Sequence, residues 1–361
     1  MSTSLTPWLD HAESDPAGLP EEGYVALLGA DGPELEALCT LADAVRAEAV
    51  GDELTVVANR NLDTATVARD PAPLDALVDE AVELGATEVC VQGALPEDVP
   101  GDGYLDLVHR ITTRSAAAGR PLHLHAFRPA EVDDAARRAG VPAHAWLTTA
   151  RDAGLGSVPG TAARILDDRL RARLVEGGDL PVARWLELIT TAHDVGLRST
   201  ATMVFGHVET PAQQIAHLRV LAEVQCRTGG FTEFIAMPLL PAAVPPGLRA
   251  EYRGADAREI RALHAVARLL LHGRIPHVQV AWTKIAPELV PALLRGGADD
   301  LGGLLLDGTL RPDAGAEAGR ELTIGDVERL AAALGRTVRQ RTTTYDDPPP
   351  GRRLMGAGIV P

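Results

Sequence analysis

Histidine and acidic side chains stand in two places where their spacing suits binding or acid–base chemistry. His123 and His125 are two residues apart in a predicted strand, so their side chains face the same side. His207 and Glu209 follow the end of another predicted strand, at Val204. Imidazole and carboxylate groups at such an edge could bind a divalent metal, hold a ring carbonyl of a ligand, or satisfy buried backbone groups. These alternatives stay open, and our prediction names ligand binding without a metal.

A third acidic group, Glu233, lies on a strand among phenylalanines and is expected to project away from them. It is a candidate for ligand recognition, with a structural ion pair as the equal alternative. Thr202 alternates with Thr200 on the preceding strand and could line the same cavity. Catalytic roles stay unassigned, and the candidates for them are His125, His207, Glu209 and Glu233.

Short apolar, β-branched runs alternate with longer helical segments along the chain, which favours a parallel α/β fold. Eight strands and their helices fit a (β/α)8 TIM-type barrel, in which chemistry lies at the carboxyl ends of the strands. The predicted strands are 54–58, 87–92, 122–127, 156–159, 198–204, 231–237, 277–282 and 300–305. The predicted helices are 74–84, 103–118, 130–139, 143–153, 182–195, 211–227, 257–271 and 323–334.

The same pattern predicts three parts in the chain. Residues 1–50 read as a helical N-terminal lead-in, and residues 51–345 as the barrel. Residues 346–361 carry three consecutive prolines and little apolar sequence, so we expect a mobile tail.

Composition narrows the function classes. The 361 residues carry 34 Lys and Arg against 50 Asp and Glu, a net charge of −16, which disfavours binding to nucleic acid and to anionic membranes. No signal peptide or membrane-spanning stretch is recognised, so we predict a cytoplasmic protein. The three cysteines, Cys39, Cys90 and Cys226, have no disulfide or zinc spacing. A small-molecule ligand is the expected partner, and a homodimer is left open.

Several longer motifs occur together in one order. They include His125-Ala-Phe-Arg-Pro129, Val158-Pro-Gly-Thr-Ala-Ala-Arg-Ile-Leu166, Gly206-His-Val-Glu-Thr210 and Thr228-Gly-Gly-Phe-Thr-Glu-Phe234. Through them the chain, from about Leu41 to Tyr345, resembles the second half of FO synthase, a radical-SAM enzyme of coenzyme F420 biosynthesis. It is also similar to aminofutalosine synthase of the menaquinone pathway. The resemblance implies a radical-SAM TIM-type barrel that couples tyrosine to 5-amino-6-ribitylaminouracil.

One family feature is absent from the sequence. In the family, the triplet read here as Asn59-Arg60-Asn61 opens a loop with three cysteines that hold a four-iron cluster beside S-adenosylmethionine. Here the expected loop reaches only to Val67 before a proline-rich stretch and contains no cysteine. Because thiolates are the ligands of such a cluster, we predict that neither the cluster nor S-adenosylmethionine is bound, and that no other cofactor replaces them.

Other departures lie near the expected pocket. Arg128 stands where the family has a small hydroxyl residue, and Arg164 where it has an acid. An arginine at a pocket mouth suits a carboxylate or phosphate. The predicted ligand-binding set, including positions implied by the resemblance, is Asn59, Gln92, His125, Arg128, Arg164, Thr202, His207 and Glu233.

These observations leave three hypotheses for function. The first is a cluster-less relative of FO synthase that binds a small polar or heteroaromatic ligand, such as an aminouracil, a tyrosine-like molecule or a deazaflavin, in a binding or regulatory role. The second is a repurposed non-radical enzyme that catalyses a cyclisation, isomerisation or elimination in bacterial specialised metabolism. The third is the family's radical transfer itself. Whether the chain is an enzyme is therefore not decided by its sequence.

Overall fold

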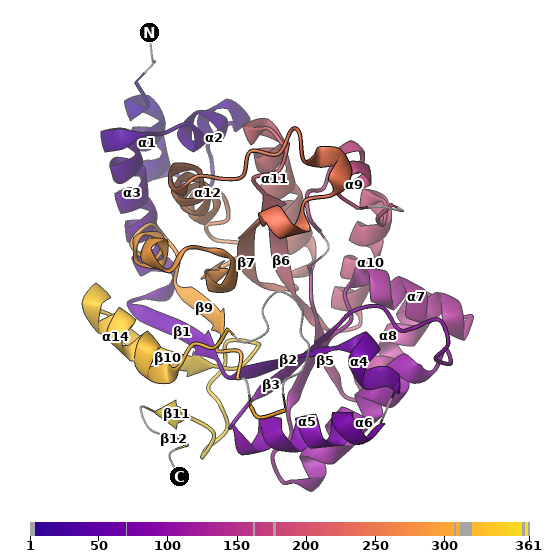
Figure 1. Ribbon diagram of the computed structural model, residues 1–361. Helices are drawn as coiled ribbons and strands as arrows, with labels where there is room; N and C mark the ends of the chain where they lie inside the picture. The colour runs from indigo at the N-terminus through magenta and orange to yellow at the C-terminus, as the bar shows by residue number, and fades with distance from the viewer. Residues whose placement is uncertain are drawn as a thin grey trace. The chain divides into compact units, whose positions relative to one another are not determined.

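The structure divides into two compact units, which are described separately (Figure 1). The computed structural model describes residues 4–69, 71–161, 163–175, 178–306, 308–310, 320–355 and 358–359. The first unit comprises Met1–Leu54, Ala163–Arg184 and Thr200–Leu301. The second comprises Thr55–Ala162, Trp185–Ser199 and Gly302–Pro361.

In the first unit the strands β6, β7, β8 and β9 are neighbours in that order. The pairs β7–β8 and β8–β9 are parallel. Helices α3 and α12 lie side by side, and α2 packs on both α11 and α12 (Figure 1). The elements that lie wholly or largely here are α1 (Thr6–Ser14), α2 (Glu21–Leu28), α3 (Gly32–Val50), α9 (Asp168–Leu174), β6 (Arg198–Phe205), α11 (Pro211–Thr228), β7 (Phe231–Pro238), η1 (Pro241–Ala243), η2 (Pro246–Leu248), α12 (Ala257–Leu270), β8 (His277–Val280), η3 (Trp282–Lys284), η4 (Pro287–Leu289), α13 (Val290–Leu294) and β9 (Asp300–Gly303).

In the second unit the strands β2, β3, β4 and β5 pair in parallel, and the first two residues of β6 continue the series. Helix α5 packs on α6, and α7 on α8 (Figure 1). The elements are β1 (Glu53–Val57), β2 (Asn59–Asp63), α4 (Thr64–Arg69), α5 (Pro71–Glu83), β3 (Glu88–Gln92), α6 (Gly103–Ala117), β4 (His123–Ala126), α7 (Pro129–Ala139), α8 (Ala143–Asp152), β5 (Leu155–Val158), α10 (Val182–Asp194), α14 (Ile324–Leu334), β10 (Thr337–Arg341), β11 (Leu354–Met355) and β12 (Gly358–Ile359).

The predicted fold class is confirmed. All eight predicted strands are present, with ends within a few residues of the prediction, and helices follow them in the expected alternation. The fold is α/β of the TIM-barrel type, with a helical N-terminal lead-in formed by α1, α2 and α3. The division into lead-in, barrel and tail stays a prediction, since the two compact units follow a different partition.

The stretch that begins at Asn59 differs from its prediction as a loop. Residues Asn59–Asp63 form β2, which pairs in register with β3, and the chain continues directly as α4. The sequence Asn-Arg-Asn-Leu-Asp has low strand propensity. Its strand form depends on the ladder to β3, a tertiary interaction that local sequence does not reveal.

Local signals explain where the helices of the first unit begin and end. Helix α11 starts with a capping box, in which the Thr210 hydroxyl accepts from the Gln213 backbone and the Gln213 side chain accepts from the Thr210 backbone. Pro211 occupies its first turn, and Gly229 ends it in the left-handed conformation. Asp256 and Glu259 form the equivalent box at the start of α12. These caps fix the register of the side chains that both helices present.

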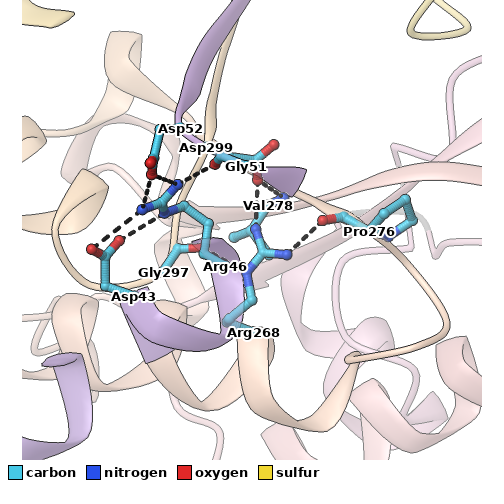
Figure 2. Close-up of polar contacts among 9 residues, drawn as sticks. All are labelled: Asp43, Arg46, Gly51, Asp52, Arg268, Pro276, Val278, Gly297 and Asp299. Carbon is cyan, nitrogen blue, oxygen red and sulfur yellow. Dashed lines mark hydrogen bonds and ion pairs between the residues drawn. The ribbon is translucent and has the colours of Figure 1, made fainter. Parts of the chain in front are cut away.

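Two buried arginines of the first unit make polar contacts close to the points where strands begin (Figure 2). Arg268 of α12 donates to the backbone oxygens of Gly297 and Pro276 and to the Asp299 carboxylate. Asp299 also accepts from His277 Nδ1 at 2.6 Å and from the Val278 backbone at 2.8 Å. Burial opposes ionisation of Asp299, but the His277 hydrogen bond and the Arg268 charge outweigh it and hold its pKa below the usual value.

The second arginine, Arg46, links the end of α3 to the residues before β1. Its guanidinium contacts Asp43 at 2.8 Å and Asp52 at 3.3 Å, and it also donates to the Gly51 carbonyl (Figure 2). These contacts lie at strand starts, the end of a TIM-type fold that is associated with stability rather than chemistry.

The described part of the chain contains no helix with the length and apolar character needed to cross a bilayer. In the segment predicted as a mobile tail, Arg352 is buried and donates to the carbonyls of Pro121 and Ala86. The Gln340 side chain of β10 makes two hydrogen bonds to this segment: its Nε2 donates to the Arg352 carbonyl, and its Oε1 accepts from the Leu354 backbone N–H. This part of the tail is therefore bound to the second unit, and mobility of the rest stays a prediction.

Candidate functional site

The second unit brings two predicted histidines to one serine. Ser157 of β5 stands opposite His125 of β4 in the strand register. The Ser157 hydroxyl lies 2.7 Å from His125 Nδ1 and 2.7 Å from His123 Nε2. The two histidines therefore share a face of β4, as their spacing predicts. Sequence reasoning missed Ser157, because no local signal marks a serine that pairs across strands.

Both histidines of this cluster are neutral at pH 7. Burial lowers the pKa of His123 to about 4 and that of His125 to about 3. The Ser157 hydroxyl has one proton, so it donates to one ring and accepts from the N–H of the other. The tautomers of His123 and His125 are thereby coupled through Ser157. His125 Nε2 has no hydrogen-bond partner among the described residues and is left available to a ligand.

Gly156 makes room for this arrangement. A Cβ atom at position 156 would lie 2.6 Å from Cε1 of the His123 ring, closer than real Cβ atoms approach other heavy atoms. The imidazole therefore occupies the space that a side chain at 156 would need, so a substitution there would require the His123 ring to move.

We expect Ser157→Ala to lower the free energy of unfolding by about 1–3 kcal/mol, because two buried ring nitrogens lose their partner. Urea denaturation at pH 7.5 measures this change. Thr149→Ala, which removes an exposed hydroxyl bonded to the Ala145 carbonyl, is the control, with an effect within about 0.5 kcal/mol. Equal stability of the two variants would contradict the role given to Ser157.

Asn59 and Gln92, also in the second unit, are engaged within the protein. The Asn59 side chain accepts from the Leu305 backbone at 3.0 Å and donates to Asn61 at 3.2 Å. Gln92 Nε2 lies 2.9 Å from the sulfur of Cys90 on the same face of β3. Ligand binding by Asn59 or Gln92 stays a prediction.

Arg128 caps α7. Its backbone N–H donates to Glu131 at 2.6 Å, and its guanidinium Nε donates to the same carboxylate at 2.8 Å. Glu131 is only 2% exposed, so the pair is a partly buried clamp at the helix start. The arginine that replaces the family's hydroxyl residue therefore forms an internal ion pair, and a role toward a ligand stays a prediction.

In the first unit His207 and Glu209 form one tight turn after β6. Glu209 accepts from the backbone N–H groups of Gly206 at 2.6 Å and His207 at 2.9 Å, and from Gln214 at 2.8 Å. His207 Nδ1 lies 3.0 Å from the same carboxylate, although not in hydrogen-bond geometry. Burial lowers the pKa of His207, against the charge of Glu209. The turn holds the two side chains close together, and its backbone N–H groups occupy most of the Glu209 carboxylate, so a ligand role for either residue stays a prediction.

The remaining candidates of the first unit are Thr202, Glu233 and Arg164, and the contacts described here for them are with residues outside this turn. Thr202 is fully buried, and its carbonyl accepts from His217 Nε2 at 2.9 Å. Glu233 is buried on β7 and accepts from the neighbouring Thr232 hydroxyl. Arg164 pairs with Asp179 at 2.8 Å, in a left-handed backbone conformation with a φ of 46°. Their predicted ligand contacts stay predictions.

A cavity of about 540 Å³ opens at the carboxyl ends of β7 and β8 in the first unit. Its walls are mainly apolar, and charged groups from Arg253, Lys284 and Glu288 join them. Tyr252 is held there by its hydroxyl, which donates to the Leu239 carbonyl at 2.7 Å. The size suits a small molecule, and the strand ends are where TIM-type enzymes bind substrates. Sequence reasoning missed this cavity, because its walls come from irregular segments without a motif.

The cysteines lie in three separate elements. Cys39 in α3 and Cys90 in β3 are buried, and Cys226 in α11 is exposed. Within the described residues, no three His, Cys, Asp or Glu side chains are grouped in a way that could hold a metal ion. These residues therefore do not identify a set of ligands for an iron–sulfur cluster.

Curated relatives cover most of the chain, although no family model matches it. FO synthase of Mycobacterium leprae (strain TN) is 43% identical over 96% of this chain and 42% of its own length. FO synthase of Streptomyces coelicolor is 41% identical over 98% of this chain and 43% of its own length. The chain thus spans about two fifths of these proteins. A 5-amino-6-(D-ribitylamino)uracil–L-tyrosine 4-hydroxyphenyl transferase of Archaeoglobus fulgidus is 37% identical over 85% of this chain and 92% of its own length.

Solved structures agree on the fold. The [FeFe]-hydrogenase maturase HydG superposes with a TM-score of 0.66 at 13% identity, covering 96% of this chain and 77% of that one. Methylornithine synthase (PylB) superposes with a TM-score of 0.66 at 16% identity, covering 92% of this chain and 97% of that one. At such identities the likeness concerns the fold alone, which is of the TIM-barrel type.

The relatives overturn the prediction of a chain without cofactors. FO synthase is a radical-SAM enzyme that uses a four-iron cluster and S-adenosylmethionine. The prediction relied on a single loop without cysteines, and the similarity to FO synthase extends over nearly the whole chain. The prediction was therefore wrong.

Proposed function

This chain belongs to the family of 5-amino-6-(D-ribitylamino)uracil–L-tyrosine 4-hydroxyphenyl transferases and FO synthases, and we propose that it serves the 4-hydroxyphenyl transfer for which that family is named. The observation that carries the proposal is the extent of the Archaeoglobus fulgidus relative. The chain matches 92% of that transferase at 37% identity, whereas it matches 42% of the length of the Mycobacterium leprae FO synthase.

The cavity at the ends of β7 and β8 supports an aromatic amino acid as one substrate. Its volume of about 540 Å³ exceeds what a tyrosine needs, and Leu240, Ile260 and Leu289 offer apolar contact to a ring. Arg253, although paired with Glu259 at 2.6 Å, is exposed and can also meet a substrate carboxylate.

For the aminouracil we propose His125 as the main contact from the second unit. Its Nε2 is unengaged within the described residues, while Ser157 holds the opposite nitrogen and so fixes the ring. A neutral imidazole can donate to a ring carbonyl or accept from an amine, and both groups occur on an aminouracil. The other predicted ligand residues, Asn59, Gln92, Arg128, Arg164, Thr202, His207 and Glu233, remain part of the proposal.

The family's cofactors would supply radical chemistry if they were bound, and the described residues do not identify the side chains that would hold them. The proposed part of this chain's own residues is to hold the two substrates: apolar walls for the ring, Arg253 for the carboxylate and His125 for the aminouracil. Burial at Ser157 and His125 also keeps water from the aminouracil contact. A small-molecule partner, a homodimer and a cytoplasmic location stay predictions.

The test is anaerobic reconstitution with iron, sulfide and reductant, followed by iron analysis and incubation with S-adenosylmethionine, tyrosine and 5-amino-6-(D-ribitylamino)uracil. Mass spectrometry should detect the 4-hydroxyphenyl adduct of the aminouracil. Protein that takes up iron but neither forms the adduct nor binds the aminouracil would overturn the proposal. Aminouracil binding without any adduct would instead support the binding or regulatory role, the first hypothesis from the sequence.

A paired measurement tests the role of His125. Calorimetry should show that His125→Gln weakens aminouracil binding up to about tenfold, the effect of one lost hydrogen bond. His144→Gln changes an exposed histidine of the same unit and should leave binding unchanged. Equal affinity of the two variants would remove His125 from the site.

A further inference from the structure

A second cavity of the first unit, of about 570 Å³, is lined by three arginines. Arg219 and Arg227 come from α11, and Arg274 from the turn that follows α12. Along α11 the lining positions are three or four residues apart, so the helix presents one face to the cavity. Its other lining residues are Ala17, Ala222, Glu223, Cys226 and Leu270.

This cavity lies at the end of the unit away from the proposed substrate site. Helix α11 leads into the start of β7, and the turn with Arg274 leads into the start of β8. The substrate cavity follows the carboxyl ends of the same two strands. The arginine cavity is thus a separate feature with no part in the proposed transfer.

The three guanidiniums are not neutralised within the protein. Among the described residues, none of Arg219, Arg227 and Arg274 forms an ion pair. Glu223 is four residues from both Arg219 and Arg227, the spacing at which helical ion pairs form, yet it pairs with neither. Elsewhere in this unit Arg173, Arg253 and Arg261 all have carboxylate partners. The cavity therefore carries a local excess of positive charge, with three arginines against one glutamate, in a chain of net charge −16.

Two of the arginines are held in place. Arg219 donates to the Leu19 carbonyl at 3.0 Å, and its guanidinium lies 5.6 Å from the centre of the Tyr24 ring. Arg274 donates to the Leu270 carbonyl at 3.0 Å. Its own carbonyl accepts from Gln225 of α11 at 3.1 Å, which ties the turn to the helix. A site with fixed donors loses little side-chain entropy when a ligand binds.

The charges of Arg219 and Arg274 both act on the Tyr24 hydroxyl. Burial raises the pKa of Tyr24 to about 12, and both Arg219 and Arg274 oppose that rise. Each guanidinium has five N–H donors, and each makes one hydrogen bond here. Most of their donors therefore remain for a ligand.

We infer that this cavity binds a small multivalent oxyanion, of the phosphate-ester or polycarboxylate class. Guanidiniums recognise phosphate and carboxylate oxygens in bidentate geometry, and three of them match an anion with more than one charge. Ala17, Ala222 and Leu270 give the site an apolar floor beside the charged groups, which suits an organic anion. The site extends the protein's ligands beyond those of the proposed transfer.

Cys226 provides a direct readout, because it lines the cavity and is exposed while Cys39 and Cys90 are buried. Alkylation of Cys226 by neutral iodoacetamide is followed by mass spectrometry, with pyrophosphate or citrate added and the ionic strength kept constant with sodium chloride. We expect pyrophosphate, citrate or both to slow alkylation. The one that acts identifies the phosphate or the carboxylate class.

Arg227→Gln should weaken this protection about tenfold, the factor expected for one lost charge-assisted hydrogen bond. Arg227 is exposed on α11, so the variant should fold. Arg249→Gln is the matched control, because it removes the same charge from an exposed arginine outside the cavity. Protection no greater than that by sodium chloride, or equal protection in the two variants, would overturn the inference. Neither result depends on transfer activity.

Discussion

Replacing Arg268 with methionine is expected to lower the free energy of unfolding by about 3–5 kcal/mol, the usual cost of removing one partner of a buried ion pair. Arg268 and Asp299 are each 1% exposed. The substitution takes the cation from a buried carboxylate and leaves the carbonyls of Gly297 and Pro276 without their donor (Figure 2). Urea denaturation at pH 7.5 measures the loss.

Two further variants separate this effect from a general loss of arginine. Arg261→Met lies on the same helix but breaks an ion pair with the exposed Glu36, so its cost should stay below about 1 kcal/mol. Arg268→Met combined with Asp299→Leu removes both charges and should recover part of the loss. A cost for Arg268→Met as small as that for Arg261→Met would show that Asp299 does not need its cation.

Acid is expected to destabilise the protein well above the range in which carboxylates titrate. Five buried or half-buried histidines have pKa values lowered by burial: His123, His193 and His264 to about 4, and His125 and His217 to about 3. The pKa of each histidine in the folded chain lies below its value of about 6.5 in the unfolded chain. Below pH 6.5 these histidines are therefore protonated in the unfolded chain while they stay neutral in the folded chain. Their stabilising effect is complete above pH 6.5 and is lost as the pH falls from there toward 4.

Each such histidine contributes about 1 kcal/mol of loss between pH 6.5 and 5.5, so the group should lower stability by several kcal/mol. Denaturant unfolding at pH 7.5, 6.5 and 5.5 measures the slope. His264 donates from Nδ1 to the Ile260 carbonyl at 2.7 Å, and its Nε2 is buried without a partner among the described residues. His264→Leu should therefore reduce the slope by about one histidine's share. Constant stability from pH 7.5 to 5.5 would contradict this account.

The sequence predicted most of the strands, because their apolar, β-branched runs carry their own signal. Strands β2, β10, β11 and β12 were missed, and β2 shows why: polar residues such as Asn59 and Asn61 become a strand only through pairing with β3. A ladder of this kind depends on residues far along the chain, and no local pattern reports it.

For the candidate site, the sequence predicted which residues belong to it, but it did not predict which side chains they contact. His123 and His125 were expected on one face, and they share it, but their meeting at Ser157 follows a register shift between β4 and β5 at Leu124 and His125. Likewise the sequence shows an arginine at position 128, but its ion pair with the buried Glu131 was not predicted. Cross-strand register and side-chain direction are set by packing, which a single sequence does not state.

The glycine beside the histidine pair has a consequence for how this protein can change. The His123 ring fills the volume that any side chain at position 156 would take, so a substitution of Gly156 alone would displace the ring. A smaller residue at 123 would open that volume, but it would also end the contact with Ser157. Positions 123 and 156 therefore form one unit of variation. Descendants that lose the histidine gain the freedom to lose the glycine, whereas losing the glycine first would also cost the contact between His123 and Ser157.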